Sequence, residues 1–220
     1  MLNPGAVNLI IFDLDGTILS AKKTIYHAVK KAFDRMGLAS AYDEEGIERY
    51  FGVPYDEFYR LITPEDERSR WQEVRDKVEE EYPAALREFA CSFPGVADTL
   101  DTLRRRRYRL ALYSNSPTSY FYPAISALGI RDRFDYVECV KENGLIKPEL
   151  ARNIRARFGG IKTAIVGDRV HDVDAARAIG ALSIGVLYGY GGNEPEQADI
   201  TIKSFPELLD TFACPKDVSG

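Results

Sequence analysis

The stretch "LIIFDLDGTIL" (residues 9–19) decides the fold of this chain. A run of apolar residues ends abruptly at two acidic residues, Asp13 and Asp15, which are separated by a single leucine. A short apolar run bounded by a turn signal is typical of a strand buried inside a parallel sheet. The stretch therefore predicts a central strand that presents carboxylates at its carboxyl end.

Composition narrows the class of protein. The chain has 220 residues, of which 45% are hydrophobic, and a net charge of -5. This length supports one core, or one core with a smaller satellite domain. The acidic balance offers no electrostatic footprint for nucleic acid or an anionic membrane, so small solutes are the expected partners. No apolar run approaches the roughly 20 residues that span a bilayer.

The cysteines indicate a reducing environment. Cys91, Cys139 and Cys214 are scattered singly and odd in number. They predict neither a disulfide framework nor a zinc site. The N-terminus also lacks the basic and apolar regions of a secretion signal. We therefore expect a cytoplasmic protein.

After the first strand the pattern becomes helical. Apolar residues recur at spacings of three and four over residues 22–36, and Gly37 follows as a stop. Residues 43–62 predict two short helices broken at "FGVP", and a long helix is predicted to begin at Thr63. We therefore expect residues 21–91 to form an all-helical domain.

From residue 92 onward, helical and strand patterns alternate. Alternation of this kind predicts an α/β fold in which helices cover both faces of a doubly wound, Rossmann-like parallel sheet. We expect a core of residues 1–20 and 92–220, a helical cap of residues 21–91 inserted into it, and a loose tail at the C-terminus. The expected strands after the first are residues 109–114, 136–140, 163–168, 182–187 and 199–202.

Polar residues follow several of these strands. The first strand ends at Asp13, the next at Ser114 and Asn115, and a later one at Asp168, with Asp172 one helical turn further on. Ligands of doubly wound sheets bind at the carboxyl ends of the strands. Carboxylates that converge there would repel one another without a cation, and oxygen ligands favour Mg²⁺. The pattern therefore predicts a magnesium site, provided that the topology is correct.

Each motif also has a purely structural explanation when it is taken alone. "DLDG" can be a turn in which aspartate satisfies backbone donors, and "YSNSP" can be a turn or a helix cap. Lys147 can be an ordinary solvated lysine. The order of the motifs along the chain decides between these explanations and a functional site.

Asp-x-Asp-Gly-Thr, Ser-Asn, Lys-Pro and Gly-Asp-x-x-x-Asp occur here in that order. They resemble the four motifs of the haloacid dehalogenase superfamily of phosphotransferases, and the resemblance covers nearly the whole chain. The cap inserted after "DGTIL" resembles that of the branch with phosphoglycolate phosphatases and β-phosphoglucomutases. One departure is Arg169, where many relatives have a small residue, so an extra cation is expected to border the site.

The resemblance implies a division of catalytic roles. Asp13 would attack phosphorus and form an aspartyl-phosphate. Asp15 would protonate the departing alkoxide and then accept a proton from the attacking water. Lys147, which we prefer to Lys141 because Pro148 can begin the next helix, would neutralise charge on the nucleophile and the phosphate.

The resemblance also implies the binding residues. The phosphate would contact Ser114, the amide of Asn115 and the loop at Gly16 and Thr17, where Thr17 would also support the loop. The Mg²⁺ ligands would be Asp13, the backbone carbonyl of Asp15, Asp168 and Asp172, the last directly or through water.

The resulting interpretation is a Mg²⁺-dependent phosphatase for small phosphate monoesters, a monomer or homodimer with a small phosphorylated metabolite as its partner. The segment "VLYGYGGNEPEQADITIKSFPELL" resembles the tail of phosphoglycolate phosphatases, although nucleotidases share similar tails. A phosphomutase would need the same core and remains an alternative. Asp15 argues against a dehalogenase, and the acidic pair on the first strand argues against a signalling receiver domain. In the cap, Arg49 and Tyr55 are candidates for contacts to the leaving group.

Overall fold

The core of the molecule is a parallel sheet of six strands. The computed structural model describes residues 4–39, 42–51, 53, 55–139 and 145–212. The strand order is β5-β4-β1-β6-β7-β8, and every pair is parallel. This arrangement confirms the expected α/β class. The strands are β1 (Leu9–Asp13), β4 (Arg109–Ser114), β5 (Tyr136–Cys139), β6 (Thr163–Gly167), β7 (Leu182–Val186) and β8 (Ile200–Ile202).

The stretch that opens the sequence forms the central strand. β1 pairs with β4 on one side and with β6 on the other, and all five of its residues are buried. Side chains alternate along a strand, so Ile10 and Phe12 join one apolar cluster, and Leu9 and Ile11 join another on the opposite face. This double burial explains why the strand is a continuous apolar run.

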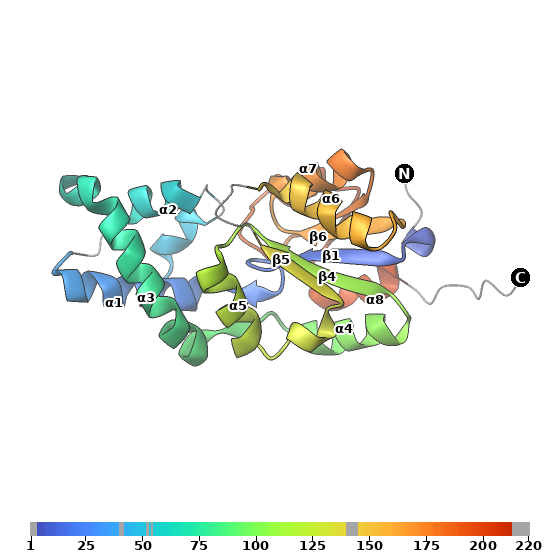
Figure 1. Ribbon diagram of the computed structural model, residues 1–220, viewed down its shortest axis with the longest axis horizontal. Helices are drawn as coiled ribbons and strands as arrows, with labels where there is room; N and C mark the ends of the chain where they lie inside the picture. Colours follow the sequence, from blue (N-terminus) through green and yellow to red (C-terminus); the bar gives the residue numbers. More distant parts are fainter. Residues whose placement is uncertain (1–3, 40–41, 52, 54, 140–144, 213–220) are drawn as a thin grey trace, which may run out of the picture.

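Helices cover both faces of the sheet (Figure 1). One apolar cluster contains residues of α6 (Lys147–Arg157) and α7 (Val170–Ile179). The other contains residues of α4 (Val96–Arg105), α5 (Thr118–Ala127) and the short α8 (Leu208–Thr211). Short 3₁₀ helices lie at Pro4–Ala6, Arg131–Arg133, Glu194–Gln197 and Phe205–Glu207.

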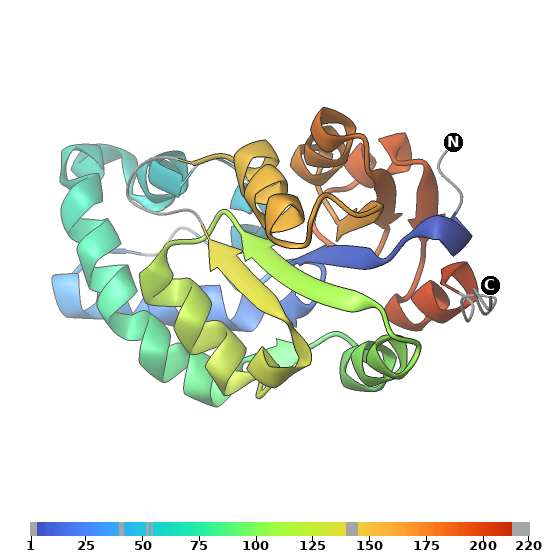
Figure 2. The ribbon, with the colours of Figure 1, turned by 45° about the vertical axis from the view of Figure 1, so that its right-hand side comes forward.

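The segment between β1 and α4 is helical and lies at the end of the sheet opposite the two termini (Figures 1 and 2). We call residues 21–91 the helical insert. Its two connections to the core, β2 (Leu19–Ser20) and β3 (Cys91–Ser92), pair with each other as antiparallel strands. The exact domain limits stay a prediction. The insert comprises α1 (Lys22–Met36), α2 (Tyr55–Ile62), α3 (Trp71–Phe89) and the 3₁₀ helices Gly46–Tyr50 and Glu65–Arg70.

The long helix of the insert begins later than the sequence indicated. Residues Glu65–Arg70 form a 3₁₀ helix, and the α-helix begins only at Trp71. Arg70 has a ψ of 12°, outside the α-helical range. Its guanidinium donates hydrogen bonds to Glu67 and Glu73 and joins the two helical segments at this bend.

Several sequence-based expectations fall outside the described residues: part of the "FGVP" break, the last residue of the strand expected at 136–140, Cys214 and the tail. Of the other cysteines, Cys91 is exposed and Cys139 is buried. The cytoplasmic location stays a prediction. Within the described ranges, no helix is both long and apolar enough to cross a membrane.

The order of the strands places the functional edge of the sheet. From β1 the chain builds β4 and β5 on one side and then β6, β7 and β8 on the other. Such a reversal leaves a crevice at the carboxyl ends of the strands beside it, which is where doubly wound sheets bind ligands. Here those strands are β1, β4 and β6.

Candidate active site

A cavity lies at this edge of the sheet, between the core and the helical insert. The core side includes Asp13, Asp15, Ser114, Lys147 and Asp168. Aromatic side chains of the insert form the facing wall, and Tyr120 and Tyr190 contribute from the core. The polar strand ends and the helical insert thus line the same cavity.

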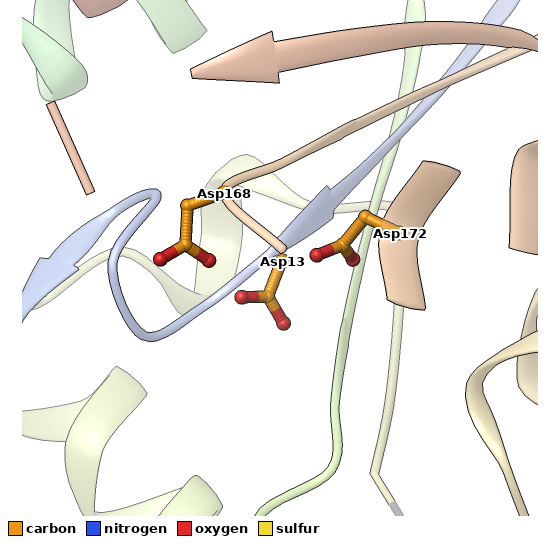
Figure 3. Close-up of side chains that lie close together, drawn as sticks. All are labelled: Asp13, Asp168 and Asp172. Atoms are coloured by element: carbon orange, nitrogen blue, oxygen red, sulfur yellow. The ribbon is translucent and has the colours of Figure 1, made fainter. Parts of the chain in front are cut away.

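Three carboxylates from separate elements converge beside this cavity. Asp13 ends β1, Asp168 follows β6, and Asp172 lies in the first turn of α7. Their side chains point toward one another (Figure 3), and one oxygen of each lies within 4.8 Å of the others. All three residues are at most 4% exposed. The structure therefore places close together the three side-chain carboxylates that the sequence predicted as metal ligands.

Lys147 is the counter-charge buried among them. Its Nζ lies 2.8 Å from Asp13 Oδ1 and 2.8 Å from Asp172 Oδ1. The Tyr113 hydroxyl also donates a hydrogen bond of 2.6 Å to Asp172 Oδ1. Burial opposes the charged form of Lys147, but the two carboxylates outweigh it and raise its pKa above the ordinary value. Lys147 is therefore a fixed cation in direct contact with Asp13.

One lysine does not balance three carboxylates. Burial is the largest cause that raises the pKa of Asp13 well above its usual range, and the neighbouring carboxylates add to it. Burial and the charge of Asp172 raise the pKa of Asp168 to about 7. A cation placed among these groups would stabilise their charged forms.

The donor set fits a magnesium ion. Asp168 Oδ2 accepts a hydrogen bond from the backbone N–H of Tyr190 at 2.7 Å. Asp168 Oδ1 is buried and has no hydrogen-bond partner in the part of the chain that the structure describes. A buried acceptor without a donor calls for an explanation, and a hard cation held by carboxylate oxygens supplies one.

Asp15 lies apart from this cluster and has different partners. Its carboxylate accepts hydrogen bonds from the Ser116 hydroxyl at 2.9 Å and the Tyr120 hydroxyl at 2.8 Å. Burial raises its pKa, although these two hydrogen bonds oppose the shift. Only its backbone carbonyl was expected to bind metal, and that role stays a prediction.

Sequence reasoning assigned no role to Ser116 or Tyr120. Ser116 lies two residues beyond Ser114 in "YSNSP", so its place at the strand end was a usable signal. Tyr120 lies on the first turn of α5, 105 residues from Asp15, and no local pattern indicates this contact.

The loop after β1 requires glycine at position 16. Gly16 has a φ of +81°, and a Cβ atom there would lie 2.2 Å from Asp168 Oδ2. Close approach of the backbone to the carboxylate cluster therefore excludes a side chain. Thr17 is fully buried, and its carbonyl accepts a hydrogen bond from the Tyr188 hydroxyl at 2.9 Å. It does not line the cavity, a position that suits loop support but not direct phosphate contact.

The two residues expected to bind phosphate after β4 both line the cavity. Ser114 is buried, and its Oγ accepts a hydrogen bond from the backbone N–H of Ser116 at 3.0 Å. Asn115 is exposed. Their phosphate-binding roles stay a prediction.

Of the two residues in the helical insert that were expected to contact the leaving group, one lines the cavity and the other does not. Tyr55 lines the cavity. Arg49 does not: it is exposed, donates a hydrogen bond to the Gly46 carbonyl at 2.7 Å, and lies 5.6 Å from the centroid of the Tyr50 ring. A short 3₁₀ helix directs its side chain back onto its own backbone, so a specificity role for Arg49 has no support in the structure.

Arg169, in contrast, borders the cavity as expected. Its guanidinium makes two hydrogen bonds to Glu194, of 2.8 and 2.9 Å, and a third to the Phe51 carbonyl at 2.5 Å. All three nitrogens are therefore engaged. Arg169 joins the core to the helical insert, and Glu194 balances its charge.

We expect Arg49→Ala to leave substrate ranking unchanged, because the side chain does not reach the cavity. The ratio of kcat/KM for two phosphate esters that differ in leaving group should stay within about twofold of the wild-type ratio, as for ordinary surface substitutions. Tyr55→Ala, which alters the cavity wall, is the matched comparison and should change that ratio. A larger shift for Arg49→Ala than for Tyr55→Ala would return Arg49 to the specificity role.

Comparison with known proteins identifies the family. Residues 10–186 match the family described as haloacid dehalogenase-like hydrolase. The match covers the central strand, the helical insert and the polar residues at the strand ends. The chain belongs to this family of enzymes.

Similarity to individual relatives identifies the chain as a phosphatase. The phosphoglycolate phosphatase of Chromobacterium violaceum is 29% identical over 95% of this chain and 98% of its own length. That of Pectobacterium atrosepticum is 27% identical over 93% and 92%. A crystal structure of a predicted phosphoglycolate phosphatase from Haemophilus somnus superposes with a TM-score of 0.79 at 24% identity, covering 93% of this chain and 97% of that one.

Proposed function

We propose that this phosphatase hydrolyses small phosphate monoesters with Mg²⁺ through an aspartyl-phosphate on Asp13. One observation carries the proposal. Lys147 Nζ lies 2.8 Å from the Asp13 carboxylate at the carboxyl end of β1, while Asp15, held by other partners, faces the same cavity. A nucleophile beside a fixed cation, with a second carboxyl group nearby, is the arrangement that two-step phosphoryl transfer needs.

In the first step an Asp13 carboxylate oxygen attacks phosphorus. The bond between phosphorus and the ester oxygen breaks, and the departing alkoxide takes the proton of the Asp15 carboxyl group. The product alcohol leaves, and the phosphoryl group remains on Asp13. Ser116 and Tyr120 hold the Asp15 carboxyl group in place for this transfer.

In the second step water attacks phosphorus and gives a proton to Asp15. The bond between phosphorus and the Asp13 oxygen breaks, so inorganic phosphate leaves and the Asp13 carboxylate is restored. Asp15 ends protonated, as it began. Lys147 stabilises the negative charge that accumulates in both steps, while Ser114 and the Asn115 amide contact phosphoryl oxygens.

The residues that would hold Mg²⁺ are Asp13, Asp168 and Asp172, with the Asp15 carbonyl as a further ligand. When bound, the ion supplies positive charge that allows an anionic phosphate to approach an anionic nucleophile. The helical insert closes one side of the cavity, which favours small metabolites over large substrates. The names of the relatives support a phosphate monoester as substrate.

Removal of the metal tests the magnesium part of the proposal. We expect the chelated protein to release no phosphate from ethyl phosphate, because Asp13 then lies among buried carboxylates, and among the described residues Lys147 is the one cation in an ion pair with it. Addition of Mg²⁺ in excess of the chelator should restore release, whereas Na⁺ at the same ionic strength should not. Unchanged turnover after chelation would exclude Mg²⁺ from the reaction.

A further inference from the structure

The described part of the cavity wall that faces the catalytic groups is aromatic and carries no cation. The helical insert contributes Ile25, Tyr50, Phe51, Tyr55, Phe58 and Tyr59, among others. None of the described lining residues of the insert is a lysine, arginine or histidine.

The aromatic rings form a connected set. Tyr55 and Phe58 each lie 5.1 Å from Tyr59 at an interplanar angle of 80°. Phe51 lies 4.9 Å from Tyr190 of the core at 79°. Edge-to-face pairs of this kind fix the rings of the insert against one another and against the core. The wall is therefore a preorganised surface that can receive a flat group.

The cations on the core side of the cavity are already paired. Lys147 contacts two carboxylates at 2.8 Å. Arg169 uses its three nitrogens on Glu194 and the Phe51 carbonyl. His171 also lines the cavity, but its side chain is exposed to water on the core side. Among the described residues, both the lysine and the arginine that line the cavity are therefore paired with acidic side chains.

We infer that the leaving group of the substrate is uncharged and aromatic, or similarly flat and apolar. This inference rests on the proposed phosphatase function and adds its substrate class. An anionic leaving group would lose water at this wall without gaining a counter-charge, and ring faces carry negative partial charge. An aromatic alcohol would instead pack against the rings through dispersion and burial. 2-Phosphoglycolate, whose leaving group carries a carboxylate, suits this wall poorly.

Four esters in two matched pairs test the inference. Ethyl phosphate and 2-phosphoglycolate differ mainly in a carboxylate, as do benzyl phosphate and 4-carboxybenzyl phosphate. With Mg²⁺ present, kcat/KM should be at least about tenfold higher for the uncharged member of each pair, and highest for benzyl phosphate. Equal or higher values for the two carboxylates would overturn the inference.

A gain of function at the wall provides a second test. Tyr55→Arg places a cation at the half-buried first residue of α2, and we expect it to raise kcat/KM for 4-carboxybenzyl phosphate relative to benzyl phosphate by about tenfold. Tyr26→Arg makes the same change at a half-buried tyrosine of the insert that does not line the cavity, and should leave this ratio at the wild-type value. No change in the ratio for Tyr55→Arg, or an equal change for Tyr26→Arg, would show that the leaving group does not lie against this wall.

The two proposals fail in different ways. If none of the four esters is hydrolysed with Mg²⁺, the proposed function is wrong. If ethyl phosphate is hydrolysed but benzyl phosphate is not preferred to 2-phosphoglycolate, the phosphatase assignment stands and only the aromatic substrate class is wrong.

Discussion

Asp13→Asn should abolish turnover, with phosphate release falling by about 10⁴-fold or more, as expected for the loss of a catalytic nucleophile. An amide is a poor nucleophile and cannot form the aspartyl-phosphate. Asparagine has nearly the same shape as aspartate and removes one of three crowded carboxylates. The variant should therefore fold, and the loss should lie in the chemical step.

Two measurements distinguish loss of the nucleophile in Asp13→Asn from a nonspecific loss of activity or folding. Rapid acid quenching with labelled substrate should trap a phospho-enzyme in the wild-type protein and none in Asp13→Asn. Asp174→Asn is the matched control, because Asp174 is exposed on α7 and pairs only with Arg177 among the described residues. Its turnover should match the wild type. A labelled phospho-enzyme in Asp13→Asn would show that another residue is the nucleophile.

The sequence predicted the sheet and the position of the carboxylates for the same physical reason. A strand buried on both faces is a continuous apolar run, as residues 9–12 are, and parallel strands end at a common edge. Residues far apart in sequence, such as Asp13 and Asp168, could therefore be placed together without knowledge of their contacts. Gly16 was assigned by resemblance as a point of backbone approach to the phosphate, which stays a prediction, whereas its close approach to Asp168 Oδ2 became evident only from the structure.

The tyrosines that complete the site could not be predicted in this way. Tyr113 bonds Asp172 and Tyr120 bonds Asp15 across 59 and 105 residues of chain. Tyr113 ends an apolar run and Tyr120 begins an aromatic run, so their patterns indicate only core packing. Their hydroxyl partners depend on how α5 and α7 sit on the sheet, which local pattern does not specify.

The contacts of Arg49 and Arg169 likewise could not be predicted from local sequence. Arg49 was a candidate for contacts to the leaving group, but in its 3₁₀ helix the guanidinium Nε donates to the nearby Gly46 carbonyl and the side chain does not line the cavity. Arg169 stands beside a motif aspartate, yet its two main partners, Glu194 and Phe51, lie in distant parts of the chain. The role of a surface cation therefore depends on which acceptors tertiary folding brings within its reach.

Lys147→Met should lower the free energy of unfolding of the metal-free protein by about 3–5 kcal/mol, the usual cost of removing one partner from a buried ion pair. Lys147 is 5% exposed and contacts both Asp13 and Asp172, which are as deeply buried. Methionine occupies a similar volume, so the loss reflects missing counter-charge more than missing packing. Urea unfolding in the presence of chelator measures it.

Lys30→Met is the matched control for this loss. Lys30 forms an exposed pair with Asp34 on α1, and water screens exposed pairs, so they contribute far less to stability than buried ones. If the variant at position 147 loses no more stability than the one at position 30, then the carboxylate cluster does not depend on the lysine for its charge balance.

Magnesium should separate the two roles of Lys147. If Asp13, Asp168 and Asp172 bind the ion, Mg²⁺ should raise the free energy of unfolding of Lys147→Met more than that of the wild type. In that variant no lysine among the described residues contacts the cluster, so the ion supplies the missing counter-charge. Turnover should nevertheless remain about 10²- to 10³-fold below wild type, since a fixed donor to the reacting groups is lost. Equal stabilisation of both proteins by Mg²⁺ would mean that the ion and the lysine do not share these carboxylates.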